Sequence, residues 1–153
     1  MKKVAIIPFL IMGISVRTTN QDQQALKDIT NLWQRFGEEG ILEKIPHRKN
    51  EVIYSLYTDY DGDHTQPYTT VIGCEVTTID KVPEGMVVKK VEGGRYWKSS
   101  AKGDLMKGII GKHWNTIWNT ELKRSYLSDF EVYDERTADP SHAEVDFYIG
   151  IND

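Results

Sequence analysis

The sequence predicts an α+β fold in which a unit of one strand, one helix and two strands occurs twice. Each of two amphipathic helical segments follows one strand-like segment and precedes two more. The segments NLWQRF (31–36) and TIWNTE (116–121) lie at the same point of each helix, and Tyr57 and Tyr133 each end the strand that follows. A duplicated unit implies a pseudo-two-fold axis. We expect a curved antiparallel sheet with both helices on one side and a groove on the other.

Length and composition are those of one globular domain. The chain has 153 residues, of which 39% are hydrophobic and 27% are charged, close to the averages for folded domains. Its single cysteine, Cys74, excludes an internal disulfide and a cysteine-based zinc cluster. The net charge of −4 argues against non-specific binding to nucleic acid. We therefore expect one cytoplasmic domain over residues 1–153 that contacts neither a membrane nor, directly, nucleic acid.

The first strand-like segment covers residues 3–18. It is apolar and rich in β-branched residues, and a bend or bulge is expected near Gly13. A lysine pair before an apolar run is also typical of a secretory signal, but no small-x-small cleavage site follows. We interpret the segment as the first strand of the mature fold.

Two segments have the periodicity of helices that pack on a sheet. The first starts at Asn20, which has the capping-box spacing with Gln23, and stops at Gly37. The second begins at Asp104. The stripes contain Leu26, Ile29, Leu32, Trp33 and Phe36 in the first helix and Leu105, Ile109, Ile110, His113, Trp114, Ile117 and Trp118 in the second. We assign the three tryptophans to the core.

The remaining strand-like segments complete the two units. The turn-rich DGDHTQP separates the first pair, and Gly93-Gly94 predicts an irregularity in the long segment that follows. The first unit thus spans about residues 3–80 and the second about 86–151. The predicted strands are residues 51–60, 68–79, 86–101, 128–135 and 143–151.

Glu131 is the candidate binding residue with the clearest pattern. In DFEVY, alternation sends Phe130 and Val132 to one face of the strand and Glu131 and Tyr133 to the other. With Phe130 and Val132 beneath the helices, Glu131 points into the concave side. A carboxylate among aromatic rings suits a hydrophobic organic cation. The same pattern is also typical of a glutamate on a solvated strand face.

Aromatic residues on or beside the predicted strands are candidates for the walls of a pocket. The sequence has 8 tyrosines and 4 tryptophans, and large amphipathic rings suit a binding groove. Core packing explains many of them equally well. The candidate ligand-binding residues are Glu131, Tyr133, Trp97, Tyr68, Tyr57, Tyr54 and Tyr148.

No metal or cofactor site is indicated. In DYDGDH, Gly62 comes too early for a calcium loop, and Thr70 stands where the closing glutamate is needed. The histidines show no metal-ligand spacing, and GxGxxG, Walker A and GxSxG motifs are absent. Cys74 lacks an indicated histidine partner and is interpreted as a small strand residue.

In order along the chain, GISVRT, LWQRF, YSLYTDYDGD, YTTVIGCEV, GGRYWKSSAKGD, WNTIW and DFEVYDE resemble the gyrase-inhibitor-like small-molecule-binding domain. This is the effector-binding domain of AraC- and MerR-type multidrug regulators. The likeness runs from about Gly13 to Ile151 and is closest to stand-alone bacterial forms, including integron-cassette-encoded proteins that bind cationic drugs.

The resemblance implies a duplicated βαββ fold that binds lipophilic cations through a buried glutamate in an E-x-Y strand. Glu131 and Tyr133 match that motif; Tyr68, Trp97 and Tyr148 fall at aromatic positions that vary among relatives. The regulators of the family attach a helix-turn-helix DNA reader. Because the resemblance fills the chain, we expect no DNA-binding domain, so that transcriptional control requires a partner.

Three functions follow as hypotheses. The first is a module that senses or sequesters amphipathic cations, with Glu131 as counter-ion. The second is a hydrolase of electrophilic small molecules, with Glu131 as general base. The third is an inhibitor that acts through protein interaction, its acidic C-terminal strands facing a basic partner. A homodimer or another protein partner fits any of them, and no cofactor is expected, since haem finds no clear axial ligand.

Overall fold

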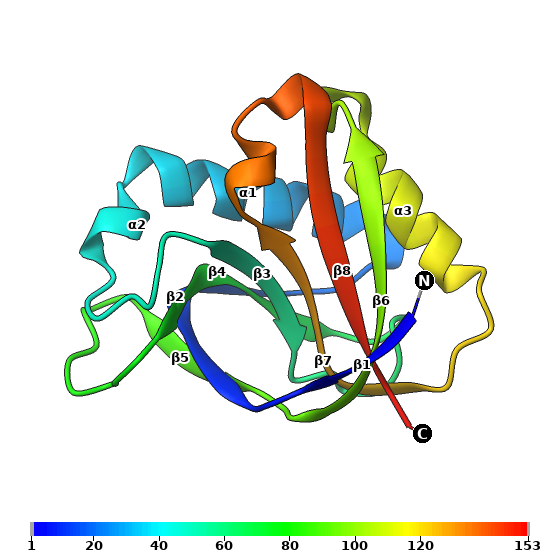
Figure 1. The fold of residues 1–153 in the computed structure, drawn as a ribbon, viewed down its shortest axis with the longest axis horizontal. Coiled ribbons are helices and arrows are strands. Elements are labelled where there is room, and N and C mark those ends of the chain that lie inside the picture. The colour runs from blue at the N-terminus through cyan, green and yellow to red at the C-terminus, as the bar shows by residue number, and fades with distance from the viewer. Residues whose placement is uncertain (1, 153) are drawn as a thin grey trace.

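A computed structural model describes residues 2–152, in which an eight-stranded antiparallel sheet carries three α-helices (Figure 1). The α+β class is confirmed. Short 3-10 turns precede α1 and α3 and link the last two strands. The elements are β1 (Lys2–Ile6), β2 (Phe9–Thr18), α1 (Gln24–Glu38), α2 (Ile41–Lys44), β3 (Ile53–Thr58), β4 (Tyr68–Val76), β5 (Val87–Val91), β6 (Gly94–Gly103), α3 (Ile109–Trp118), β7 (Arg124–Tyr133) and β8 (Ala143–Ile151).

The sheet topology has the predicted two-fold symmetry. The strand order is β1-β6-β8-β7-β3-β4-β2-β5. Exchanging β1, β2, β3 and β4 with β5, β6, β7 and β8 gives the same order in reverse, so the two halves occupy equivalent places. The pseudo-axis passes between β3 and β7, the pair at the centre of the sheet, where Ser55 lies opposite Glu131.

The two ends of the sheet meet. β1 lies at one end and β2 next to the other, yet only Ile7 and Pro8 join them; Glu92 and Gly93 join β5 to β6 in the same way. A Cβ on Gly93 would lie 2.6 Å from the Pro8 ring, so the two crossings touch. Proline lacks the N–H that continues a strand ladder, and the predicted strand 3–18 therefore divides at Pro8.

Gly13, where a bend was expected, lies within an unbroken ladder. It pairs with Gly73 of β4, and a Cβ built on Gly13 would lie 2.0 Å from the Ile72 carbonyl oxygen. Only glycine permits this close approach of two backbones. The prediction of a bulge here was wrong, while the irregularity at Gly93-Gly94 is confirmed as the break between β5 and β6.

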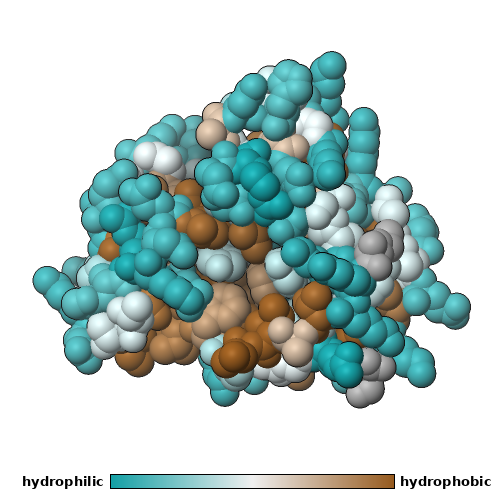
Figure 2. Space-filling model, in the orientation of Figure 1, coloured by the Kyte–Doolittle hydropathy of each residue, from teal (hydrophilic) through white to brown (hydrophobic). Residues whose placement is uncertain are grey.

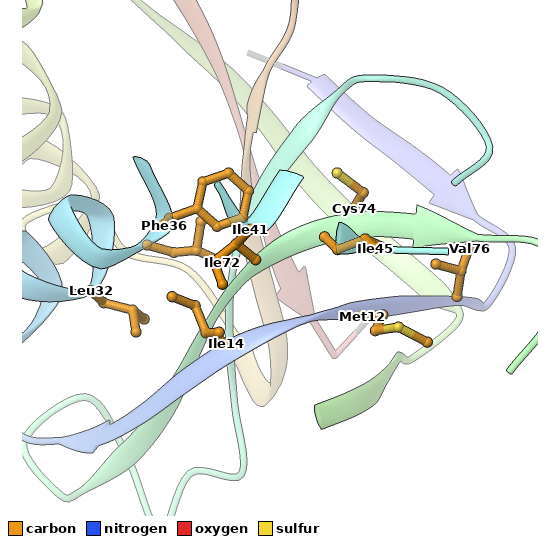
Figure 3. Packing of buried hydrophobic residues seen from close by; sticks show 9 residues of the cluster. All are labelled: Met12, Ile14, Leu32, Phe36, Ile41, Ile45, Ile72, Cys74 and Val76. Carbon is orange, nitrogen blue, oxygen red and sulfur yellow. The ribbon is translucent and has the colours of Figure 1, made fainter. Parts of the chain in front are cut away.

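The two longer helices, α1 and α3, cover the same face of the sheet, which we call the outer face. Leu32 and Phe36 of α1 and Ile41 of α2 pack on Ile14 and Ile72 of the strands (Figure 3). Under α3, a second cluster joins Ile117 to the β8 residues Val145, Phe147 and Ile149. Placement of two helices on one side is therefore confirmed. No helix within residues 2–152 has the length and apolarity that a membrane crossing needs.

The inner, concave face is filled by its own apolar cluster, to which all eight strands contribute. Phe130 is at its centre, with its ring 5.7 Å from Phe9 and 4.6 Å from Tyr148. Hydrophobic surface gathers over the strands in the lower middle of Figure 2. Phe130 and Val132 thus lie on the side away from the helices, contrary to our expectation, and Glu131 lies on the helical side, where it accepts from Trp114 of α3.

Candidate functional site: an aromatic cavity with a buried glutamate

A cavity of about 590 Å³ lies on the outer face of the sheet, between α1 and α3. Its volume is within the range of small-molecule sites. Ile29 and Trp33 of α1 and Ile110 and Trp114 of α3 form two walls, and Tyr57 and Glu131 belong to the sheet below. At the mouth, Leu26 is 70% exposed and Trp118 is 42% exposed. The walls are therefore mostly aromatic and aliphatic.

Glu131 is buried, with 1% of its surface exposed, and three aromatic side chains hold its carboxylate. The Tyr57 hydroxyl donates to Oε2 at 2.7 Å and the Trp114 indole Nε1–H to the same oxygen at 2.5 Å. The Tyr133 hydroxyl donates to Oε1 at 2.6 Å. A carboxylate offers about four acceptor positions. Oε2 is saturated, and Oε1 keeps a position for a further group.

Burial raises the pKa of Glu131 above its usual 4.5, because the charged form loses its hydration. The hydrogen bonds from Tyr133, Tyr57 and Trp114 act in the opposite direction, since they favour the carboxylate over the acid. Burial prevails, and the pKa of the Tyr57 hydroxyl is likewise raised well above 10 by burial and by the neighbouring Glu131 charge. Among residues 2–152, no cationic side chain contacts this carboxyl group directly.

The strand pairing explains the position of each donor. Glu131 on β7 lies opposite Ser55 on β3, and Tyr57 is two residues further along β3 on the same face. The Ser55 hydroxyl donates to the Tyr57 hydroxyl oxygen at 3.1 Å. Ring contacts hold the helices against this polar cluster: Trp33 lies 4.8 Å from Tyr133, and Trp114 lies 5.3 Å from Tyr57.

A second polar group borders the same cavity. Arg124 Nη2 donates to Asp129 Oδ2 at 2.6 Å, and both side chains are buried, with 6% and 0% exposed. Tyr60 also donates to Oδ2 at 2.6 Å, and the Gly150 backbone N–H donates to Oδ1 at 2.9 Å. Because Arg124 and Asp129 neutralise each other, Glu131 carries the net charge of the cavity wall.

The structure brings four of the seven candidate residues together: Glu131, Tyr133, Tyr57 and Tyr68 line the cavity. Tyr68 also donates to the Asn20 side chain at 2.6 Å, which replaces the predicted helix-capping role of Asn20, since that side chain caps no helix. Tyr54 and Tyr148 lie in the inner cluster because strand alternation sends them to the opposite face. Trp97 is on the helical face but packs at the α3 cluster, outside the cavity lining.

The sequence analysis missed the contribution of the helices to the cavity. Trp33, Trp114 and Trp118 were assigned to the core, yet all three line the cavity. Trp33 and Trp114 also pack against core residues, so their assignment to the core was correct but incomplete. A buried indole N–H needs an acceptor, and this requirement indicates a polar partner for Trp114 without identifying Glu131 among the carboxylates of the chain. No sequence pattern indicated Arg124.

A curved sheet with an axial, half-enclosed cavity under two helices defines the architecture of a small-molecule-binding module. The comparisons agree with that class. The chain belongs to the Cass2 family of integron-associated effector binding proteins, whose model matches residues 5–151.

Individual relatives cover nearly the whole chain. The Vibrio cholerae integron cassette protein VCH_CASS2 has a TM-score of 0.77 at 29% identity, over 99% of this chain and 95% of its own. SAV2435, solved bound to tetraphenylphosphonium, has a TM-score of 0.75 at 14% identity, over 99% and 93%. YobU of Bacillus subtilis (strain 168), described as a candidate transcriptional regulator, is 24% identical over 143 residues, 91% of this chain and 89% of its own length.

Proposed function

We propose that the chain binds an amphipathic organic cation in the cavity between α1 and α3, with Glu131 as counter-ion. One observation carries the proposal: a carboxylate that is 1% exposed lies in an aromatic cavity and has hydrogen-bond donors but no cationic partner within the described chain. A bound cation would supply that partner.

The balance of energies favours a cation over a neutral molecule. Desolvating a carboxylate costs free energy, and a ligand charge beside it recovers part of that cost. Aromatic rings around the site add cation–π attraction of about 0.5–2 kcal/mol. Trp33, Trp114 and Tyr57 are placed to contribute it. A neutral ligand of the same shape receives the apolar contacts alone.

The family and the fold neighbours support this proposal. Effector binding is the family's described property, and SAV2435, which shares the fold, is bound to a lipophilic monocation. We infer that this chain, acting as one domain, senses or sequesters such ions in the cytoplasm. The description of YobU suggests a link to transcription, which would reach DNA through a partner protein.

Calorimetric titration with tetraphenylphosphonium tests the proposal, with triphenylphosphine oxide as the neutral analogue. The wild-type chain should bind the cation and bind the oxide at least roughly tenfold more weakly. Glu131→Gln should weaken cation binding by a similar factor or more, because one charge of a buried pair is removed. Glu121→Gln, an exposed position outside the cavity, loses the same formal charge and serves as control. Equal affinity of wild type and Glu131→Gln for the cation would refute the counter-ion role.

A further inference from the structure

Unpartnered polar atoms gather at one end of the cavity. Among residues 2–152, four buried side-chain nitrogen or oxygen atoms have no hydrogen-bond partner. Three of them belong to cavity-lining residues: Nε and Nη1 of Arg124 and Nδ1 of His64. Buried polar groups in folded proteins are almost always satisfied, so this concentration points to a missing partner.

The Arg124 and His64 side chains that carry these atoms both lie near the Tyr126 ring. The Arg124 guanidinium carbon lies 4.4 Å from the centroid of the Tyr126 ring, and the His64 ring lies 6.5 Å from it in a stacked arrangement. The Arg124 side chain is 6% exposed, and only Nη2 has an acceptor, on Asp129. Its remaining donors carry part of a full positive charge, which makes an unsatisfied site there costly.

Trp114 links this end to Glu131. Its indole Nε1–H donates to the Glu131 carboxylate, and its ring lies 6.0 Å from the Arg124 guanidinium. The same aromatic side chain therefore has an acceptor-only carboxylate and a donor-only guanidinium among its neighbours. A ligand lying along Trp114 meets both.

The wall beside Arg124 is the least regular part of the sheet. The pairing of β7 with β8 shifts between Arg124 and Asp129, and Tyr126 in this interval has a φ of 55°. Ladder hydrogen bonds do not fix this backbone as they fix the strand at Glu131. The Tyr126 ring, which lies near the guanidinium, therefore stands on backbone outside the regular ladder.

We propose that the preferred ligands carry, besides their cationic group, a hydrogen-bond acceptor such as a carbonyl oxygen, which the Arg124 guanidinium binds beside Trp114. This inference rests on the proposed function and narrows the ligand class from lipophilic cations to bifunctional ones. The His64 ring borders the same place and can donate a second hydrogen bond when Nδ1 is protonated.

Two probes of equal charge and nearly equal shape test the inference. Both are (biphenyl-4-ylmethyl)trimethylammonium ions; one has a 4′-acetyl group and the other a 4′-isopropyl group, so they differ in one acceptor oxygen. On the wild-type chain, the acetyl probe should bind roughly tenfold more tightly than the isopropyl probe, as expected for a hydrogen bond to a charged donor. The carbonyl stretch of the bound acetyl probe should move to lower wavenumber.

Arg124→Lys is the informative variant, because the lysine can keep the ion pair with Asp129 while the guanidinium donors are lost. The ratio of the two dissociation constants should fall from about ten to about one. Glu131→Gln should weaken both probes and leave their ratio near the wild-type value. The infrared measurement needs no variant, so it stands even if Arg124→Lys fails to fold.

Each alternative result has a distinct meaning. Equal binding of the two probes to wild type, or an unshifted carbonyl stretch, would show that water satisfies the guanidinium and would overturn the inference alone. Persistence of the acetyl preference in Arg124→Lys would also overturn it. Failure of both probes and of tetraphenylphosphonium to bind wild type would overturn the proposed function and this inference together.

Discussion

Ser55 and Glu131 lie directly opposite each other across the central strands β3 and β7, on the pseudo-two-fold axis. Ser55 precedes Tyr57 by two residues, as Glu131 precedes Tyr133, so the two are equivalent positions of the two halves. One half supplies a carboxylate and the other a hydroxyl. Both tyrosines reach the carboxylate, and Ser55 instead supports Tyr57. The symmetry thus gives one acidic site with two nearly equivalent donors.

Replacing Glu131 by glutamine should stabilise the empty protein. The amide keeps an acceptor oxygen, and a tyrosine hydroxyl can rotate to accept from its NH₂ group. Removing a desolvated charge should increase the free energy of unfolding by about 1–3 kcal/mol at pH 8. Urea unfolding of ligand-free wild type and variant measures the difference; a less stable variant would show that the carboxylate is net stabilising.

The difference in stability between wild type and Glu131→Gln should increase with pH. The pKa of Glu131 is raised in the folded state, so its contribution to wild-type stability is fully present below the unfolded value of about 4.5 and is lost as pH rises through the folded pKa. Thermal midpoints of wild type and Glu131→Gln should therefore converge in acid and separate as pH increases. Parallel curves over this range would contradict the raised pKa.

Cation binding should weaken in acid. A proton on Glu131 competes with the ligand, and affinity for tetraphenylphosphonium should fall about tenfold per pH unit once pH is below the raised pKa of that carboxyl. Titrations across pH 4–8 check this, and residual binding by Glu131→Gln should be flat over the same range. A flat wild-type profile would mean that the ion is held by the rings alone.

Removing one of the hydrogen-bond donors to Glu131 should change cation binding by raising the pKa of that carboxyl further. Tyr57→Phe removes the hydrogen bond to Oε2 but keeps the ring, so the acid form is favoured and the pH midpoint of cation binding should move upward. Tyr68→Phe is the matched control, because its hydroxyl bonds to Asn20 and not to the carboxylate. Equal pH midpoints in Tyr57→Phe and Tyr68→Phe would show that the Tyr57 hydrogen bond does not influence the pKa of Glu131.

Tyr148 should matter for stability and not for binding. Its ring stacks on Phe130 at 4.6 Å in the inner cluster, on the face away from the cavity. Tyr148→Ala should lose about 3 kcal/mol of unfolding free energy, while the folded fraction keeps a cation affinity within about twofold of wild type. Chemical denaturation and calorimetry measure the two effects, and a large loss of affinity would restore Tyr148 as a ligand residue.

The order of elements could be predicted because apolar periodicity and turn residues are local signals. The helix ending near Gly37 and the break at Gly93-Gly94 needed no knowledge of neighbours. The role of Gly13 was missed because it depends on Gly73, which is distant in the sequence. The four-residue helix α2 carries too short a pattern to be recognised.

For the site, alternation correctly separated Glu131 and Tyr133 from Phe130 but could not say which face the helices cover. That choice depends on contacts between segments that are distant in the sequence, such as the close approach of Pro8 and Gly93. The helix tryptophans were missed for the same reason, since a helix stripe on a sheet looks the same whether it fills the core or leaves a gap. Arg124 lies in the irregular start of β7, where no periodicity exists.

Floor and walls of the cavity are built differently. Glu131 is fixed in the middle of the sheet, with hydrogen-bonded strands on both sides. The walls stand on two separate helices, with Leu26 and Trp118 half open to water at the mouth. If the chain binds cations as proposed, we expect ligands of different width to share one fixed counter-ion, because no strand ladder ties the two helical walls to each other.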